Sequence, residues 1–498
     1  MNLAIAFGRA GLGVDAPLVT VEVHLANGLP GFSMVGLPET AVRESRDRVR
    51  SAIVNSGFDF PRRRITVNLA PADLPKDGGR FDLPIAIGIL AASGQLPPEP
   101  LSRWEFAGEL ALTGALRPVT GALPLALQSR RAGRQLMVPR ENGAEAALAH
   151  PDGSFAAGCL ADVTAHLRGQ ERLPTAEPLA AHPGGLQADL LGVKGQATAR
   201  RALEVAAAGA HSLLFVGPPG TGKSMLAARL PGILPPMTEG ERLESAAVRS
   251  LSQPGFHADD WGRRPFRAPH HSASPVALAG GGSRPRPGEI SLAHHGVLFL
   301  DELPEYGRQA LEVLREPLET GRVTVSRAAA QVEYPARFQL VTAMNPCPCG
   351  HLGDPLRECR CTPDQVARYR GRISGPLLDR IDLQVEVPRL RPEELQDEAP
   401  GECSAAVRTR VCAARSRRLA ESGCASADIA ADAIEQACRL GAPERRFLND
   451  ALHRLGLSAR GYHRVLRVAR TIADLADTNR VTLQHLSEAL GYRRVLDE

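Results

Sequence analysis

Gly217-Pro-Pro-Gly-Thr-Gly-Lys-Ser224 is the stretch that decides the fold of this 498-residue chain. The apolar run Ser212–Val216 comes just before it, and the helix-favouring segment Met225–Leu230 follows. In a glycine-rich loop between a buried strand and a helix, backbone N–H groups can curl around phosphates, and the helix N-terminus adds a positive dipole. The segment therefore predicts a phosphate-binding loop in a parallel α/β sheet.

The lysine of this loop is one of only three in the chain, beside Lys76 and Lys194, among 59 basic residues. Its survival in an arginine-rich chain indicates a place that needs a compact ammonium group, and argues against a glycine-rich turn without a ligand. We expect Lys223 to reach the β- and γ-phosphates of ATP and the Ser224 hydroxyl to ligate Mg²⁺. The predicted nucleotide contacts are Gly217, Pro218, Pro219, Gly220, Thr221, Gly222, Lys223, Ser224 and Asp301.

Two further apolar runs end in polar residues that suit the same pocket. Val297–Leu300 leads into Asp301 and Glu302. We expect Asp301 to hold the Mg²⁺ shell and Glu302 to polarise the attacking water. Phe338–Ala343 leads toward Asn345, whose amide can contact the γ-phosphate or orient water. The alternative for Asn345 is an ordinary turn residue before proline.

Two arginines are candidates for contact with the γ-phosphate. Arg380 lies between Asp379 and Asp382, and Arg460 stands at the start of a predicted helix. An arginine inserted into a neighbouring pocket can stabilise transition-state charge as an arginine finger. From the residues alone, a salt bridge of Arg380 to Asp379 or Asp382 is the favoured interpretation, and Arg460 could equally be a solvated helical arginine.

Composition describes an ordinary globular protein, with 43% hydrophobic residues and a net charge of +4. Such a small charge does not identify a nucleic-acid partner by itself. No apolar run is long enough to span a membrane, and the N-terminus lacks the pattern of a signal peptide. We therefore expect a cytoplasmic protein with no membrane partner.

Four of the nine cysteines are clustered in sequence, as the pairs Cys347 and Cys349, and Cys359 and Cys361. Four thiolates at this spacing can bind one structural Zn²⁺, although the C-x-C pairs depart from the commoner C-x₂-C spacing. Four reduced, packed cysteines are the equal alternative. The histidine pairs His270–His271 and His294–His295 do not favour metal binding, because neighbours in a strand point to opposite faces.

Changes of pattern along the chain predict four segments. Residues 1–168 alternate strand-like and helical runs, and residues 169–185 are rich in Pro, Ala and Gly, as in a linker. Residues 186–388 alternate strands with helices around the phosphate loop, and residues 389–498 are mostly helical. The fold class is therefore α/β, with a helical C-terminal region.

The order of these motifs resembles AAA+ ATPases. More narrowly, four segments resemble the magnesium-chelatase-like family, and the resemblance covers essentially the whole chain. The segments are Val193-Lys-Gly-Gln196, Arg267-Ala-Pro-His-His271, Asn345-Pro-Cys-Pro-Cys-Gly350 and Ser374-Gly-Pro-Leu-Leu-Asp-Arg-Ile-Asp382. The resemblance implies that 186–388 is an AAA+ core and 389–498 its helical lid. It also implies that Arg380 is the finger, Arg460 is a second sensor, and the chain self-associates into a hexameric ring.

One branch of that family implies a helicase or translocase that binds single-stranded or branched DNA and drives branch migration in homologous recombination and natural transformation. The alternative is a magnesium-chelatase-type motor subunit that drives metal insertion or remodels a partner protein. In related AAA+ proteins a hairpin before the third strand points into the ring, so Arg327 is a candidate DNA contact. Arg263, Arg264 and Arg267 form a second basic segment, which could also be a subunit contact.

Residues 67–94 are similar to the proteolytic domain of Lon, which needs a serine activated by a lysine. Arg80 stands where the serine is expected, and apolar residues near Leu123 occupy the place of the lysine. Without that pair no hydroxyl is activated for attack on a peptide bond. We therefore expect residues 1–168 to keep a Lon-like fold without its dyad, in a role of assembly or partner binding. This loss argues against a protease, and the complete set of nucleotide residues argues against an inert scaffold.

Overall fold

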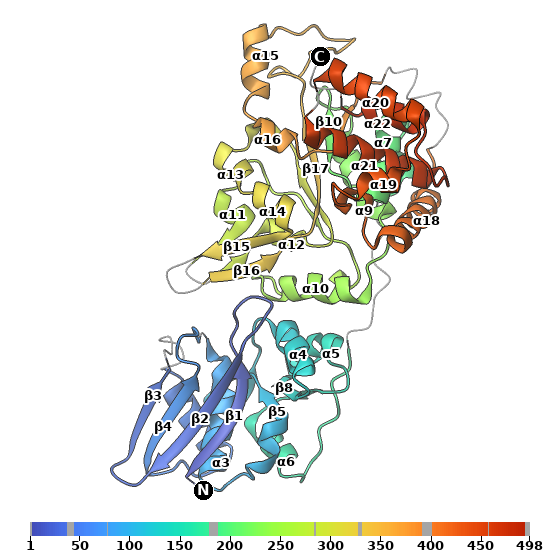
Figure 1. Cartoon of the computed structure of the whole chain (residues 1–498). Helices are drawn as coiled ribbons and strands as arrows, with labels where there is room; N and C mark the ends of the chain where they lie inside the picture. Colours follow the sequence, from blue (N-terminus) through green and yellow to red (C-terminus); the bar gives the residue numbers. More distant parts are fainter. Residues whose placement is uncertain are drawn as a thin grey trace.

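The computed structural model describes residues 2–36, 44–76, 78–178, 188–282, 285–326, 331–390, 401–456 and 458–493. Figure 1 shows an N-terminal part built on one sheet and, above it, a second part in which a sheet lies beside a group of C-terminal helices. Among these residues, no helix combines the length and the apolar character needed to cross a membrane. The chain is thus a mixed α/β protein with a helical C-terminal region.

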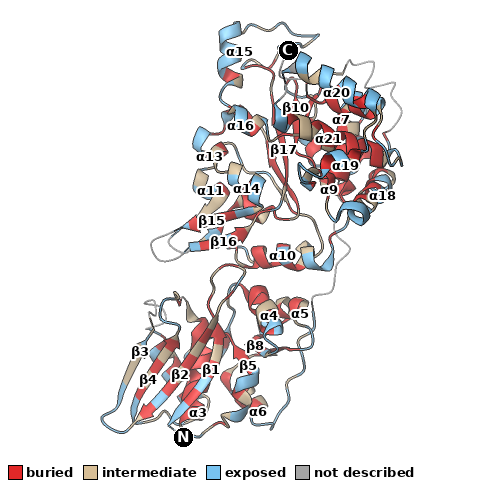
Figure 2. Cartoon of the chain, viewed as in Figure 1, coloured by how far each residue is buried: buried red, intermediate tan, exposed pale blue. Residues whose placement is uncertain are grey.

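The N-terminal sheet has seven strands in the order β3-β4-β2-β1-β5-β8-β9. Buried and less buried residues alternate along β2, as expected for a strand with one face on a core. That face is covered by α3, in which every residue is buried (Figure 2). The strands are β1 (Leu3–Arg9), β2 (Leu18–Ala26), β3 (Gly31–Val35), β4 (Arg64–Ala70), β5 (Trp104–Phe106), β8 (Gln135–Pro139) and β9 (Ser154–Ala157). The main helices are α2 (Ser45–Asn55), α3 (Asp82–Ala92), α4 (Ala122–Arg131), α5 (Arg140–Ala149) and α6 (Leu160–Leu167).

The second sheet has five strands in the order β11-β14-β17-β10-β18, and every neighbouring pair is parallel. All residues of β10, β14 and β17 are buried, which explains their unbroken apolar sequences. Because the strands are parallel, the loops after β10, β14 and β17 meet at one edge. The strands are β10 (Leu213–Val216), β11 (Phe266–Arg267), β14 (Val297–Leu300), β17 (Gln339–Met344) and β18 (Leu383–Glu386).

Helices and two short hairpins surround this sheet. The hairpin β15 (Arg322–Ser326) and β16 (Gln331–Pro335) has the strands that the sequence predicts, but its turn, with the candidate Arg327, lies outside the described residues. Tyr334 of β16 donates from its hydroxyl to the carbonyl of Pro285 (2.8 Å), beside the second hairpin, β12 (Gly280–Gly281) and β13 (Arg286–Pro287). The helices used below are α7 (Ala197–Gly209), α8 (Lys223–Ala227), α9 (Leu230–Ile233), α10 (Glu239–Ser250), α14 (Arg315–Thr320), α15 (Pro363–Arg370) and α16 (Gly375–Leu378).

The C-terminal helices share a hydrophobic core with one side of this sheet. The core joins residues of α7, β10 and β18 to residues of α18, α21 and α22. Within it, the buried guanidinium of Arg418 donates to both carboxylate oxygens of Asp474 (2.9 and 2.7 Å), so that neither charge is left unpaired. The helices are α18 (Ser404–Ser422), α19 (Ile434–Cys438), α20 (Ala442–Leu455), α21 (Ala459–Leu475) and α22 (Leu483–Gly491).

The N-terminal part is docked on α10. Apolar side chains of α4 and α5 form one buried cluster with Leu243, Ala246 and Ala247 of α10. The amide of Gly121 donates to the carbonyl of Ser250 (3.1 Å), and the Ser250 hydroxyl donates to Glu145. The loop between β1 and β2 also reaches the hairpin, since a Cβ at Gly13 would lie 2.8 Å from Val332. The two parts are therefore held together by packing as well as by the chain between them.

Candidate nucleotide pocket and cysteine cluster

The loop after β10 has the backbone that the glycine pattern predicts. A Cβ at Gly217 would lie 2.2 Å from the carbonyl oxygen of Val387, so only glycine fits there. Gly222 has φ +89°, in the left-handed region that favours glycine, and α8 begins directly after it. The amide of Gly217 donates to the carbonyl of Met344 (3.2 Å), which ties the loop to the end of β17.

Lys223 folds back onto this loop. Its ammonium donates to the carbonyl oxygens of Gly217 (2.7 Å) and Pro218 (2.9 Å) and to Oδ1 of Asn345 (3.1 Å). The side chain is 8% exposed, and burial lowers the pKa of the ammonium to about 8, although the charges of Asp301 and Glu302 act in the opposite direction. Phosphate oxygens would replace the carbonyls as acceptors and stabilise the charged form, which raises the pKa of the ammonium.

Nucleotide affinity should therefore fall above pH 8. Phosphate binds the protonated ammonium, so affinity is nearly constant while Lys223 stays charged and is lost as the pH rises past its pKa. From pH 7.5 to pH 9 we expect the Kd of a non-hydrolysable ATP analogue to rise about tenfold. Calorimetric titration at the two pH values measures this. Lys223→Ala is the control, because it has no ammonium to titrate and its weaker binding should not change with pH; a flat wild-type profile would contradict the assignment.

The two predicted magnesium ligands are already side by side. The hydroxyl of Ser224 donates to Oδ2 of Asp301 (2.5 Å), across the gap between the loop and the end of β14. Glu302 has φ +52°, and its amide donates to Oδ1 of Asp301 (2.9 Å). The side chain of Glu302 is 53% exposed. A hydroxyl and a carboxylate at this distance suit a hydrated Mg²⁺ ion.

His271 is a residue of this site that the sequence interpretation missed. Its Nδ1 lies 3.0 Å from Oε2 of Glu302. The contact holds the carboxylate of the predicted base on the side of His271. The only sequence signal was the His270–His271 pair itself, and nothing in its spacing related it to Glu302.

The pocket thus brings Lys223, Ser224, Asp301, Glu302 and Asn345 to one edge of the sheet. Asn345 contacts the lysine directly, so its side chain belongs to the pocket whatever the backbone turn before Pro346 requires. The order of the strands in the sheet explains why these residues meet. Parallel strands that are adjacent in the sheet place the residues after them next to one another, and ligands of such sheets bind at this edge.

Arg380 and Arg460 lie away from this edge within one chain. The carbonyl of Arg380 accepts from the hydroxyl of Ser212 (2.8 Å), at the amino end of β10. Its guanidinium donates to Glu319 of α14 and to the carbonyl of Pro376 (2.6 Å), and not to either flanking acid. Arg460 is exposed at the start of α21, and Arg464, one turn further on, faces Asp382 at the same amino end (3.9 Å). Within one chain, Arg380 therefore lies at the end of β10 opposite the phosphate loop.

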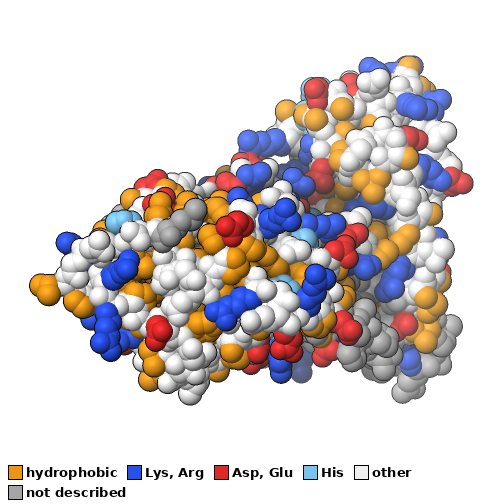
Figure 3. Space-filling view, turned by 90° about the horizontal axis from the view of Figure 1, so that it is seen from below, with side chains coloured by type: hydrophobic (Ala, Val, Ile, Leu, Met, Phe, Trp, Pro, Cys, Tyr) orange, Lys and Arg blue, Asp and Glu red, His pale blue; other side chains and the backbone are white. Residues whose placement is uncertain are grey.

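The second basic segment is occupied by contacts inside the chain. Arg264 donates to the carbonyls of Pro235 (2.6 Å) and His295 (2.7 Å), and Arg267 holds the carboxylate of Glu289 with two hydrogen bonds. Both arginines therefore stabilise the fold. Figure 3 shows basic side chains scattered among acidic and apolar ones on the face seen from below, without a continuous basic surface among the described residues there.

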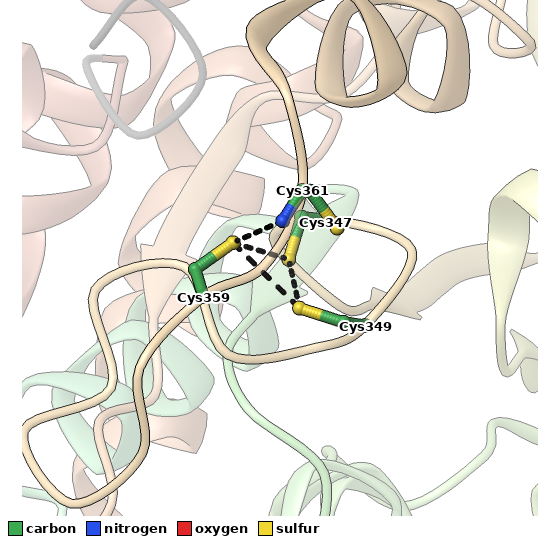
Figure 4. Close-up of side chains that lie close together, drawn as sticks. All are labelled: Cys347, Cys349, Cys359 and Cys361. Atoms are coloured by element: carbon green, nitrogen blue, oxygen red, sulfur yellow. Dashed lines mark hydrogen bonds between the residues drawn. The ribbon is translucent and has the colours of Figure 1, made fainter.

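The four predicted cysteines lie together in the loop between β17 and α15 (Figure 4). Sγ of Cys347 is 3.4 Å from that of Cys349 and 3.6 Å from that of Cys359, and all four sulfur atoms lie within 4.8 Å of one another. Backbone N–H groups of Arg360 and His351 donate to Cys349 and lower the pKa of its thiol to about 6. A tetrahedral zinc with Zn–S bonds of about 2.3 Å needs sulfur atoms about 3.8 Å apart. The cluster is therefore compatible with Zn²⁺.

The prediction that His294 and His295 point to opposite faces of a strand is wrong. These residues lie in a turn, with φ +58° at His295, and not in a strand, so both rings reach the carboxylate of Glu244 (3.3 and 2.7 Å). Nδ1 of His294 accepts the backbone N–H of Arg337 (3.0 Å), so its Nε2 carries the proton that is donated to Glu244. A nitrogen with a proton cannot ligate a metal. These histidines instead hold α10 against β14.

In the N-terminal part, the two positions predicted to have lost the protease dyad are buried. The guanidinium of Arg80 donates to the carbonyl of Thr120 (3.3 Å), and Leu123 is fully buried in the cluster against α10. A Cβ at Gly11 would lie 2.4 Å from the guanidinium of Arg80. This arginine is packed against the loop that reaches toward the hairpin.

Comparison with known proteins shows the family to which the chain belongs. Residues 189–395 match the model for magnesium chelatase, subunit ChlI, residues 21–142 match subunit ChlI of Mg-chelatase, and residues 401–493 match the ChlI C-terminal region. The Competence protein ComM of Haemophilus influenzae is 53% identical over 100% of this chain and 98% of its own length. The chain belongs to the ComM/YifB branch of the magnesium-chelatase-like family. YifB of Salmonella typhimurium is equally similar, at 53% over 99% of this chain and 98% of its own.

As a member of the ComM/YifB branch, the chain is an AAA+ ATPase of the magnesium-chelatase-like type, a class that uses ATP and Mg²⁺. A weaker similarity reaches a Lon protease of Chloroflexus aurantiacus, 28% identical over 28% of this chain and 17% of that protein. This agrees with the Lon-like character expected for part of the chain.

Proposed function

We propose that this ComM/YifB-type ATPase is a ring motor that moves on single-stranded or branched DNA and drives branch migration in homologous recombination and natural transformation. The observation that carries the proposal is the full-length similarity to a competence protein, supported by a phosphate loop whose Lys223 contacts Asn345 and whose Ser224 contacts Asp301. Hydrolysis at Glu302 supplies the energy, and residues elsewhere in the chain transmit it to the nucleic acid.

The placement of Arg380 supports the ring. It lies at the amino end of the sheet, while the phosphate loop lies at the carboxyl end, separated by the length of a four-residue strand. An arginine finger in that position serves the pocket of the next subunit, and a closed ring gives each pocket one such neighbour. We propose a hexamer, with Arg460 acting as a second sensor across the same interface.

The hairpin β15–β16 is the proposed DNA contact. Arg327 follows β15 directly in the sequence, and the hairpin rests on the second hairpin through Tyr334 and on the N-terminal part through Val332. Residues 1–168 are proposed to be a Lon-like domain that has lost its dyad and now supports this hairpin, with 169–185 as the linker, 186–388 as the AAA+ core and 389–498 as the lid. A zinc ion bound by Cys347, Cys349, Cys359 and Cys361 completes the proposed cofactors.

The competing proposal is a chelatase-type motor subunit. The family models for residues 21–142 and 189–395 carry chelatase descriptions, so the N-terminal part does not by itself separate the two functions. The magnesium-chelatase subunit ChlI of Synechocystis, however, is 28% identical over only 24% of this chain. Full-length identity of 53% to a competence protein favours the DNA motor.

DNA-stimulated ATP hydrolysis tests the proposal. We expect single-stranded DNA or a four-way junction to bind and to raise kcat several-fold, because a translocase couples its cycle to the strand it moves along. In Arg327→Ala this stimulation should be lost while basal hydrolysis remains. Arg322→Ala, at the base of the same hairpin and paired with Glu333, is the control and should keep it. Failure of DNA both to bind and to stimulate hydrolysis would contradict the DNA motor and favour the chelatase-type alternative.

A further inference from the structure

The segment between β17 and α15 (residues 345–362, the cysteine loop) packs directly against the phosphate loop. Gly350, which follows Cys349, has φ +82°, and a Cβ there would lie 2.7 Å from Cδ of Pro219 and 3.8 Å from Cγ of Asn345. The ring of Pro219 is thus seated directly on the backbone of the cysteine loop. The loop begins at Asn345, the residue that accepts a hydrogen bond from Lys223.

The far end of the same loop reaches Pro219 from another side. Asp354 has a fully buried carboxylate that contacts Nδ1 of His351 (3.1 Å) and lies 3.5 Å from the guanidinium of Arg389. Arg389 in turn donates to the carbonyl oxygen of Pro219 (3.2 Å). Pro219 is therefore held on its ring by Gly350 and on its carbonyl by an arginine that Asp354 anchors.

Two sets of contacts hold the cysteine loop in this shape, the pair of His351 with Asp354 and the group of four sulfur atoms. Between the end of β17 and the start of α15 the chain forms turns and bends and no regular secondary structure, and the four sulfur atoms are its central contact. Reduced thiols make only weak hydrogen bonds to one another, whereas four thiolates on one metal ion form a rigid tetrahedral staple. The shape that seats Pro219 thus depends on what the four sulfur atoms bind.

We propose that a zinc ion on Cys347, Cys349, Cys359 and Cys361 acts as a clamp that holds the phosphate loop ready for nucleotide. With the metal bound, Gly350 and Asn345 fix Pro219 and Lys223 in their observed positions. Without the metal, the cysteine loop loses its shape, and the phosphate loop loses the contact between Gly350 and Pro219. Nucleotide affinity is therefore metal-dependent, although no cysteine of the cluster is among the predicted nucleotide contacts. The inference rests on the proposed zinc site and is independent of DNA as the substrate.

Two glycines of the loop provide a matched pair of variants. Gly350 and Gly353 both have positive φ, +82° and +76°, so alanine costs similar backbone strain at each. The Cβ of Gly350→Ala collides with Pro219, whereas that of Gly353→Ala meets nothing within 4 Å. Both variants keep all four cysteines. Any difference between them reports on the contact with the phosphate loop alone.

The test measures zinc content and nucleotide affinity separately, on the full chain. Wild type should hold one zinc per chain by elemental analysis, and Cys359→Ser or treatment with a zinc-selective chelator in excess Mg²⁺ should remove it. Removal should raise the Kd for a non-hydrolysable ATP analogue about tenfold or more, with reloading of zinc restoring it. Gly350→Ala should keep its zinc yet show a similar rise in Kd, while Gly353→Ala stays near wild type. Circular dichroism confirms that each variant is folded.

Three results would overturn the clamp. Absence of zinc from purified wild type would remove both the metal site and the inference. Zinc that can be stripped with no change in Kd would leave the metal site standing and refute the clamp. Equal behaviour of Gly350→Ala and Gly353→Ala would show that the contact with Pro219 does not matter. None of these results bears on whether DNA stimulates hydrolysis, so failure here is distinguishable from failure of the DNA motor.

Discussion

Glu302→Gln should bind ATP and Mg²⁺ like wild type but hydrolyse ATP at least about a hundredfold more slowly, since a positioned general base contributes ~10²–10⁴-fold. Glutamine keeps the shape of the side chain and loses the charge that draws a proton from water. The predicted Mg²⁺ ligands Ser224 and Asp301 are untouched, because their own hydrogen bond (2.5 Å) does not involve the side chain of Glu302. Single-turnover hydrolysis, with binding measured by calorimetry, separates the two effects.

The control for this variant lies three residues further along the chain. Glu305 is also exposed and acidic, but it pairs with Arg372 (2.8 Å) and not with the pocket residues. Glu305→Gln should therefore hydrolyse ATP at nearly the wild-type rate. If Glu302→Gln keeps wild-type turnover, or if both variants lose activity equally, Glu302 is not the base.

Arg380→Ala should lower kcat about a thousandfold or more, the range measured for arginine fingers, with little change in nucleotide affinity. The finger stabilises charge that develops only in the transition state, so its loss affects the chemical step more than binding. Steady-state hydrolysis by the assembled ring measures this, and the oligomeric state of the variant is checked by its mass in solution.

Glu319→Ala separates this role from a structural one. Glu319 is the carboxylate that pairs with Arg380 within the chain, and it is itself largely exposed. If the pair served only to brace α14 against the segment before β18, removal of either partner would have the same effect. A finger predicts that Glu319→Ala stays active, because it frees the arginine for the neighbouring pocket.

The nucleotide pocket could be predicted from sequence because it depends on strands alone. Each of Lys223, Asp301 and Asn345 follows closely on a buried apolar strand, and the parallel pairing of those strands determines that the residues meet. The partners of the same residues could not be predicted. His271 on Glu302 and Gly350 on Pro219 result from the paths of irregular loops, which no periodicity encodes. The position of Arg380 on Glu319 likewise follows from how α14 packs.

The histidine pair His294–His295 shows how a correct pattern leads to a wrong geometry. Alternation along a strand places neighbours on opposite faces, but the positive φ of His295 reverses the chain within two residues and puts both rings on Glu244. The docking of the N-terminal part was equally beyond the sequence. The docked surface consists of buried alanines of α10 together with Gly121 and Ser250. Residues of these types occur throughout the sequence, so they do not indicate which segment packs against them.

The central claim is that each pocket hydrolyses ATP with an arginine from the next subunit, and mixing two inactive variants tests it most directly. Lys223→Ala has no working pocket but keeps Arg380, whereas Arg380→Ala has an intact pocket and no finger to give. In rings assembled from equal amounts of the two, a random arrangement completes one pocket in four, so hydrolysis should return to about a quarter of the wild-type rate. A mixture no more active than its separate components would contradict the claim.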